Sequence, residues 1–217
     1  MLLRRRRRTR DTARHDRAQC RERGASVVEA ALITPLFLLL VFGIIEVGSY
    51  LFDLTSVRAA ARDGAREGSA SASDATADRN VLVIARRGLG GVKNHIDGII
   101  VFKATSSSSV VPPSCVAALA SGLRGVADLC NIYRKADLVN PDILNFGTAA
   151  QDCAAGTKWD RCWPATERND VLTRTSSPDF LGVYIRADHR SISGIIPVRT
   201  VTASIIVPLE AQRASDE

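Results

Sequence analysis

The chain has 217 residues, of which 46% are hydrophobic and 24% are charged. This length supports one modest hydrophobic core with additional segments and excludes several large domains. A net charge of +6 is typical of nucleic-acid-binding proteins, but residues 1–24 hold ten Arg and three acidic residues. The rest of the chain has 19 basic and 20 acidic residues, so no nucleic-acid partner is expected.

A membrane-length apolar segment follows the basic stretch. It runs from Ala25 to Val47, and these 23 residues would cross a hydrocarbon layer of about 30 Å as a helix. Positively charged flanks stay in the cytoplasm, which predicts that residues 1–24 are a cytoplasmic leader. The sequence therefore predicts a single-pass protein of the cell membrane. Its N-terminus would be cytoplasmic, its C-terminal domain extracytoplasmic, and membrane lipid would surround the apolar segment.

The start of the apolar segment carries a glycine and, five residues later, a carboxylate. The sequence RERGASVVEAALITPLFLLLVFGIIEVGSYL, followed by RAAARDGAREGSA, resembles the TadE-like family, the pseudopilins of the tight-adherence (Flp, type IVc) pilus. The resemblance covers residues 21 to about 70, and the closing segment looks more loosely like the exported part of actinobacterial members. It implies a minor pseudopilin that acts in pilus assembly and surface adhesion.

The resemblance also implies a processing site. In that family, prepilin peptidase cuts after a glycine and leaves a glutamate as the fifth mature residue. Gly24 would precede the cut, Ala25 would become the new N-terminus, and Glu29 falls in the fifth place. The implied partners are prepilin peptidase, other pilins or pseudopilins, and membrane assembly proteins of the tight-adherence system.

Glu29 and Pro35 are candidate subunit-packing residues. The amine created at Ala25 would have a typical pKa of about 7.7–8.0, and the Glu29 carboxylate of a neighbouring subunit would neutralise it. Alternatively, Glu29 lies at the headgroup level and extends into water. Pro35 removes one helical hydrogen bond and bends the helix, which is either a packing feature or a tolerated kink.

The sequence predicts an α+β fold for the exported part. Residues 25–67 should form one transmembrane helix and stalk that ends before Gly68, with Arg58, Arg62 and Arg66 on a solvated face. Residues 68–78 read as a polar linker, and residues 79–217 as the exported domain. A second helix, capped by Asp74 or Asp78, should end near three glycines. The expected antiparallel strands are Ile99–Lys103, Phe180–Ala187 and Val198–Val207.

Four of the five cysteines lie beyond the leader, in a middle region, residues 114–170, that is expected to be irregular. An even number without CxxC spacing favours disulfides in an oxidising compartment over a zinc site. Four cysteines allow three pairings, of which we favour the local one, Cys115 with Cys130 and Cys153 with Cys162. Trp159 and Trp163 are expected to pack against the second of these loops.

The sequence shows no catalytic motif, metal-ligand set or cofactor-binding motif. His189 follows a predicted strand and is expected to be an exposed turn residue, and no HExxH, nucleophile or glycine-rich phosphate motif accompanies it. We therefore predict that the protein is not an enzyme. Two alternatives to the pseudopilin remain: an uncleaved single-span protein with an extracytoplasmic binding domain, and a membrane-anchored exported hydrolase.

Overall fold

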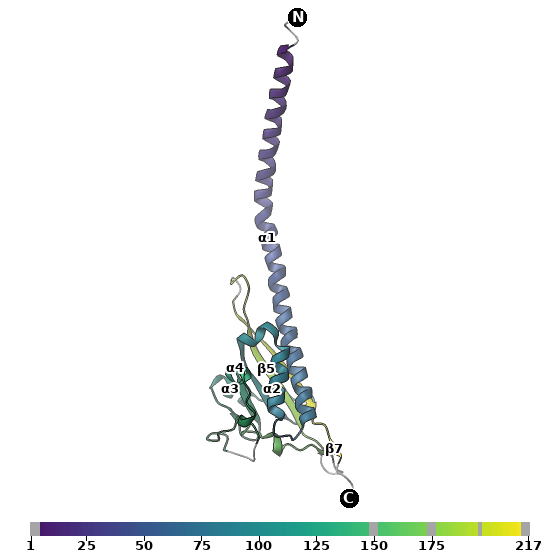
Figure 1. The fold of residues 1–217 in the computed structure, drawn as a ribbon, viewed down its shortest axis with the longest axis vertical. Coiled ribbons are helices and arrows are strands. Elements are labelled where there is room, and N and C mark those ends of the chain that lie inside the picture. The colour runs from purple at the N-terminus through teal and green to yellow at the C-terminus, as the bar shows by residue number, and fades with distance from the viewer. Residues whose placement is uncertain (1–4, 148–151, 173–176, 195–196, 214–217) are drawn as a thin grey trace. The chain divides into compact units, whose positions relative to one another are not determined.

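In the computed structural model, residues 5–147, 152–172, 177–194 and 197–213 are described, with side chains from residue 26 to residue 211 of these ranges. The chain divides into two compact units, residues 1–48 and residues 49–217. Helix α1 (Arg5–Ser71) forms the described part of the first unit and supplies the first element of the second (Figure 1).

The second unit is built around an antiparallel sheet, and the predicted α+β class is confirmed. The sheet has five strands in the order β2-β3-β1-β5-β6, and every neighbouring pair is antiparallel. Its strands are β1 (Ile96–Ala104), β2 (Gly125–Val126), β3 (Cys130–Arg134), β5 (Phe180–His189) and β6 (Arg199–Pro208). A separate parallel pair joins β4 (Val171–Leu172) to β7 (Gln212–Arg213).

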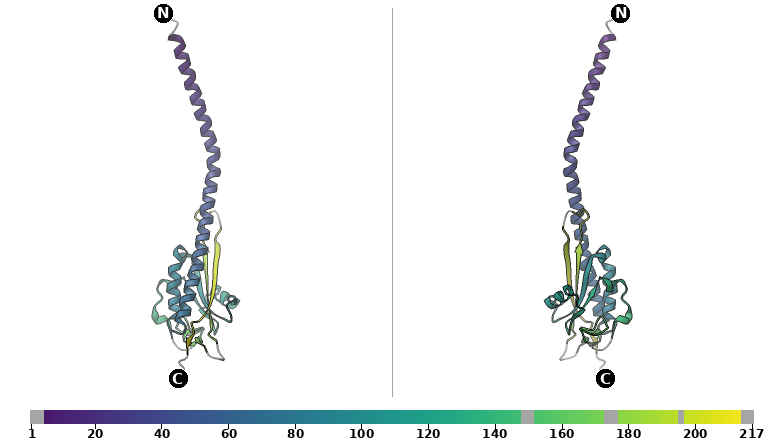
Figure 2. Two further views of the ribbon diagram at one scale, coloured as in Figure 1. Left: turned by 90° about the vertical axis from the view of Figure 1, so that its right-hand side faces the viewer. Right: turned by 90° about the vertical axis from the view of Figure 1, so that its left-hand side faces the viewer.

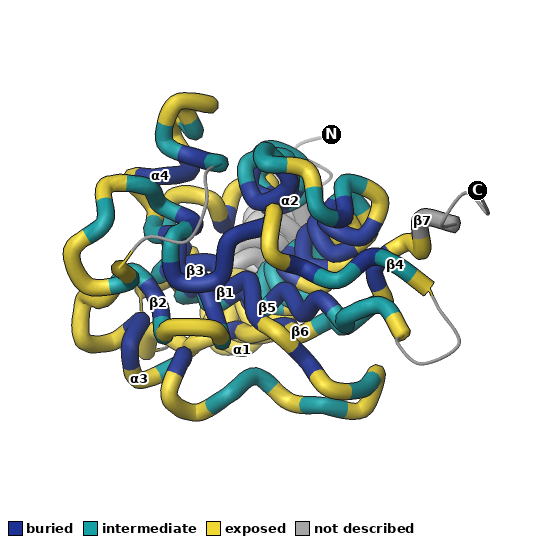
Figure 3. The backbone as a smooth tube through the Cα atoms, turned by 90° about the horizontal axis from the view of Figure 1, so that it is seen from below, coloured by how far each residue is buried: buried dark blue, intermediate teal, exposed yellow. Residues whose placement is uncertain are grey.

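Helices cover both faces of this sheet. They are α2 (Ala77–Gly88), α3 (Pro113–Ala120) and α4 (Lys135–Val139), with short 3-10 turns at Gly90–His95, Ile143–Asn145 and Ala165–Glu167. Ile99 and Val101 of β1 join the core formed with α1 and α2, whereas Ile100 and Phe102 join the core formed with α3. Figure 3 shows the buried strands between α2 and α3. Strand β1 therefore reads as an apolar run because both of its faces are covered.

Glycines bring α1 and α2 into close contact. A Cβ atom added at Gly68 would lie 2.8 Å from Val81 of α2 and 3.0 Å from Leu181 of β5. Gly68 therefore serves as a packing position inside α1, and the helix continues to Ser71 rather than ending before Gly68. The sequence alone favoured a helix end here because glycine has low helix propensity; the contact with α2 outweighs that preference.

The second predicted helix is confirmed as α2, although its start differs. Thr76 occupies the cap position, Asp74 accepts hydrogen bonds from the Thr76 amide and hydroxyl, and Asp78 lies buried in the first turn. The three predicted strands are confirmed as β1, β5 and β6. The outer residues of α1 also behave as expected, since Arg58, Arg62 and Arg66 are exposed.

Two further expectations are wrong. The middle region is not wholly irregular, because it contains α3, β2, β3 and α4; β3 has only five residues and gains its hydrogen bonds from β1, a non-local pairing that local periodicity does not reveal. His189 is not an exposed turn residue. It ends β5, is 4% exposed, and packs its ring edge-on against Tyr50.

The glycine contact between α1 and α2 yields a stability prediction. Gly68→Val should lower the free energy of unfolding of the second unit by about 1–3 kcal/mol, because the added methyl groups overlap Val81 and Leu181. Urea unfolding of the full chain in detergent measures the change. Gly91→Val is the matched control, since nothing lies within 4 Å of a Cβ added there. Equal stability of the two variants would contradict the packing role.

Candidate functional site

The first candidate region is the N-terminal part of α1. Gly24 and Ala25 lie inside the continuous helix, with Glu29 one turn further along and exposed. Most apolar side chains of residues 26–48 are also exposed, among them Leu32, Leu36, Phe37, Leu39 and Ile44. This helix is long and apolar enough to cross a membrane. Such a surface suits lipid or neighbouring apolar helices rather than water.

Pro35 interrupts the hydrogen bonding of α1. It has no amide proton to donate to the Ala31 carbonyl. The neighbouring Thr34 hydroxyl donates to the Ala30 carbonyl at 2.6 Å, one residue before the carbonyl that Pro35 affects. In a bilayer, such a backbone group is best satisfied by an adjacent helix or a polar side chain. Pro35 and Glu29 thus mark two interruptions in the first half of the apolar segment, and the buried carboxylate Glu46 lies near its end.

The second region is a buried polar cluster in the second unit, formed by Asp78, Asn131, Tyr133, Asp160 and Arg168. Asp78 and Arg168 are fully buried, and their Oδ1 and Nη2 atoms are 2.5 Å apart. The Asp78 Oδ2 atom accepts hydrogen bonds from the Tyr133 hydroxyl at 2.6 Å and from the side-chain amide of Asn131, Nδ2, at 2.9 Å. Three donors, two from β3 and one from a loop, therefore hold one carboxylate, which offsets the cost of burying it.

The loop around Trp163 closes over this cluster. The Arg168 guanidinium lies 4.2 Å from the centre of the Trp163 indole ring, an attractive cation–π geometry. The side-chain oxygen of Asn131, Oδ1, accepts hydrogen bonds from the backbone amides of Cys162 and Trp163, at 3.1 and 2.9 Å. The loop is thus attached to β3 by an asparagine at a position where a strand residue is normally apolar.

Burial governs the titration of the cluster. It raises the pKa of Tyr133 well above the usual value, and the Asp78 carboxylate adds to this effect. Burial also raises the pKa of Asp160, again with the Asp78 charge as the second cause. The Gly147 amide donates to Asp160 and partly opposes that shift. Both pKa values are raised because burial and the nearby Asp78 carboxylate disfavour a further negative charge, and the Arg168 guanidinium opposes both shifts.

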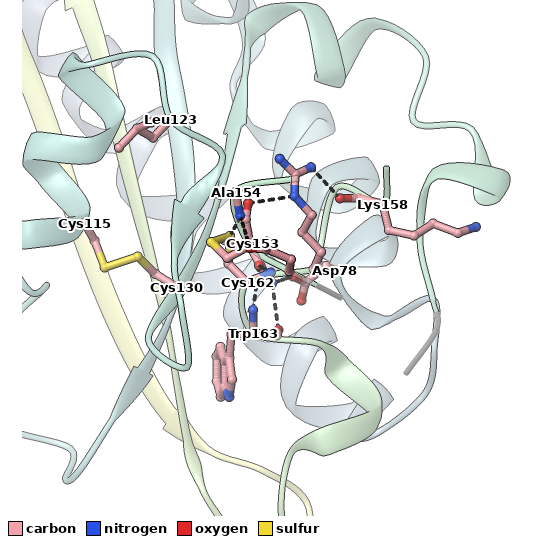
Figure 4. The surroundings of a disulfide bond; sticks show 12 residues. Asp78, Cys115, Leu123, Cys130, Cys153, Ala154, Lys158, Cys162 and Trp163 are labelled. Atoms are coloured by element: carbon pink, nitrogen blue, oxygen red, sulfur yellow. Dashed lines mark hydrogen bonds between the residues drawn. A yellow bond between two sulfur atoms is a disulfide. The ribbon is translucent and has the colours of Figure 1, made fainter. Parts of the chain in front are cut away.

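Two disulfides fix the same part of the fold. Cys115 is bonded to Cys130, which joins α3 to β3, and Cys153 is bonded to Cys162. This is the local pairing that we favoured from the sequence. Figure 4 shows the second bridge beside Trp163 and Asp78. Trp163 is 3% exposed and belongs to the core, and Trp159 packs against the same core, so both are packing residues.

The sequence analysis missed the buried cluster. Asp78 was considered only as a helix cap, and Arg168 and Asp160 lie among charged loop residues without any pattern that sets them apart. The one available signal was Asn131, a polar residue inside the apolar run Cys130–Tyr133. The cluster has no opening to bulk solvent at Asp78 or Arg168, and its geometry is that of a structural support.

The N-terminal segment of the chain matches a known protein family. The model of the family described as TadE-like protein matches residues 24–66. The chain carries a TadE-like segment. The match begins at Gly24, the residue before the cut that the resemblance implies, and ends within the helical stalk. No curated protein and no solved structure matches the chain.

Among the described residues, no His, Cys, Asp and Glu side chains form a group of three that could hold a metal ion.

His189 and Asp53 form a close pair, with 2.6 Å between Nδ1 and Oδ2. Their contact joins the end of β5 to α1 at the level of Tyr50. The pair therefore aligns the β5–β6 hairpin with the stalk.

The raised pKa of Asp160 predicts how stability depends on pH. A carboxylate whose pKa is higher in the folded than in the unfolded state costs stability as the pH rises from about 3.8 through the folded value. Asp160→Asn should therefore raise the melting temperature at pH 7, and the gain should shrink towards pH 4. The amide oxygen can still accept from Gly147. Asp142→Asn, which changes an exposed acid, is the control, and thermal melting at both pH values measures the difference. A pH-independent effect would contradict the burial argument.

Proposed function

We propose that this protein is a pseudopilin-like component of a tight-adherence (Flp, type IVc) pilus, processed by prepilin peptidase and acting in pilus assembly and surface adhesion. The family match at residues 24–66 is the observation that carries the proposal. Its cleavage site would be the Gly24–Ala25 bond. The apolar part of α1 would anchor the protein in the membrane as a single span, with residues 1–24 in the cytoplasm and the disulfide-bonded unit outside.

The surface of the apolar helix supports a role in subunit packing. Its large side chains are exposed along the helix, so that a neighbouring pilin or assembly protein can contact it on any face. Two unlike features break this uniform surface, the Glu29 carboxylate and the interruption at Pro35. A buried charge with a charged partner specifies register better than apolar contacts do. We therefore assign Glu29 to pairing with the Ala25 amine of an adjacent subunit.

The disulfides support the proposed orientation. Cys115–Cys130 and Cys153–Cys162 both lie in the second unit, and disulfides persist in exported domains rather than in the cytoplasm. The basic leader, with ten Arg in residues 1–24, favours the opposite side of the membrane for the N-terminus. Charge and redox chemistry thus agree on the same topology.

Replacement of the residue before the cut tests processing. Gly24→Lys should block maturation completely, because a long charged side chain replaces the one residue without a side chain in the peptidase cleft. Immunoblots of membranes from cells with the pilus system should then show a persistent precursor that is 24 residues longer than the mature protein. Gly43→Ala, in the same helix with open space around its Cα, is the control.

A Gly24→Lys chain that shortens normally would place the cut elsewhere. A wild-type chain that still begins at Met1 in native membranes would favour the uncleaved single-span alternative. N-terminal sequencing of the purified protein distinguishes these results directly.

Removal of the Glu29 charge tests subunit pairing. Glu29→Gln keeps the shape and should be cleaved like the wild type, but its co-purification with other pilus components should fall about tenfold or more, because the new amine loses its counter-charge. Asp63→Asn is the control, since it removes an exposed acid of α1 beyond the apolar segment. Undiminished assembly of the Glu29→Gln protein would remove the pairing role and leave Glu29 as a headgroup-level residue.

A further inference from the structure

The tip of the β5–β6 hairpin exposes apolar side chains. The last paired residues are His189 and Arg199, so residues 190–198 form the connection. Within the described part of that connection, Ile192 is 69% exposed and Val198 is 56% exposed. A single exposed apolar residue needs no explanation, but two at the end of one projecting hairpin form a small apolar tip.

Contacts along α1 show where this tip lies within the second unit. Strand β5 runs antiparallel to α1, since its beginning contacts Gly68 through Leu181 and its end contacts Asp53 and Tyr50 through His189. The hairpin therefore points towards the end of the unit at which the chain enters, Ser49. Figure 2 shows the hairpin reaching beyond α2 at this end.

The length of the chain allows the tip to reach a membrane surface. Val47, the last residue of the apolar segment, comes three residues before Tyr50, a helix rise of about 4.5 Å. Half of the nine-residue connection beyond His189 would span up to about 15 Å in extended form. The connection is thus long enough to reach the boundary at which α1 would leave the bilayer.

Charge at the tip fits the same surface. Arg190 and Arg199 are both exposed and flank the connection on its two strands. The nearby acids are engaged elsewhere: Asp53 contacts His189, Asp97 pairs with Arg186, and Asp188 accepts from Thr200. Apolar side chains between two arginines are the composition of segments that bind the interface of anionic bilayers.

We propose that the tip of the β5–β6 hairpin docks on the outer surface of the bilayer that α1 crosses. Ile192 and Val198 enter the headgroup region, and Arg190 and Arg199 bind anionic headgroups. The exported unit then has two attachments to the membrane, the helix and the hairpin, which fix its rotation about the helix axis. This inference rests on the proposed membrane span of residues 26–47.

Depth-dependent fluorescence tests the contact in the full chain. In a Cys20→Ser background the remaining native cysteines are in disulfides, so Val198→Cys introduces one reactive thiol for an environment-sensitive dye. In vesicles of phosphatidylcholine and phosphatidylglycerol, the dye should emit at shorter wavelength, be quenched by spin-labelled lipids, and be about threefold less accessible to iodide than a control. The control is Val110→Cys. Val110 is 76% exposed and follows the end of β1 that lies away from the hairpin tip.

Charge variants and lipid composition refine the result. Arg190→Gln combined with Arg199→Gln should restore iodide access to the Val198 dye, and so should vesicles without anionic lipid. Equal iodide access at Val198 and Val110 would overturn the proposal. So would a Val198 dye that is protected from iodide but not quenched by spin-labelled lipid, since that pattern indicates a protein contact.

Alkaline carbonate extraction distinguishes failure of the proposed membrane span from failure of the hairpin contact alone. A chain released from vesicles by carbonate has no membrane span, and the proposed function itself fails. A chain that stays in the vesicles while its Val198 dye remains in water keeps the span and loses only the hairpin contact.

Discussion

The second unit, residues 49–217, depends on one buried carboxylate. Asp78 begins the second helix, yet its two oxygens are held by Arg168, Tyr133 and Asn131, which come from a strand and a distant loop. Removal of Arg168 would leave the Asp78 charge without its counter-ion in the core, a change that typically costs about 3–5 kcal/mol. The helix, the strand and the loop are thus committed to one arrangement. The Cys153–Cys162 bridge, next to the same loop, limits the alternatives open to the unfolded chain.

This arrangement explains how a short, loop-rich region becomes part of a rigid unit. Strand β3 is five residues long and by itself could not hold the segment that follows it. Asn131 of this strand fixes the loop, because its side-chain oxygen accepts hydrogen bonds from two loop amides. Trp163 of the same loop stacks on the Arg168 guanidinium. The polar groups replace the apolar packing that a longer strand or helix would supply. Most residues of the larger apolar core come from α1, α2 and the long strands, and Tyr133 and Trp163 join it.

The sequence predicted those parts of the structure in which local pattern and final environment agree. Strands β5 and β6 alternate, β1 is apolar because it is buried on both faces, and α2 has a clear apolar side. It failed where a residue takes its role from a distant partner. Gly68 reads as a helix end until α2 packs against it, and His189 reads as a turn residue until Asp53 and Tyr50 are brought to it. The Asp78–Arg168 pair, 90 residues apart in sequence, leaves no local trace.

The unbroken helix around Gly24 has a further consequence. In the intact chain, Glu29 lies in the interior of α1, many turns from the helix start. Cutting after Gly24 would make Ala25 the first residue, and Glu29 would then lie at the end of the first turn, beside amide protons that no longer have intrahelical acceptors. An acidic side chain is favourable at such a positive terminus. Removal of the leader would thus move Glu29 from the middle of a helix to its positive end. The favourable interaction between its carboxylate and the helix N-terminus would exist only in the shortened chain.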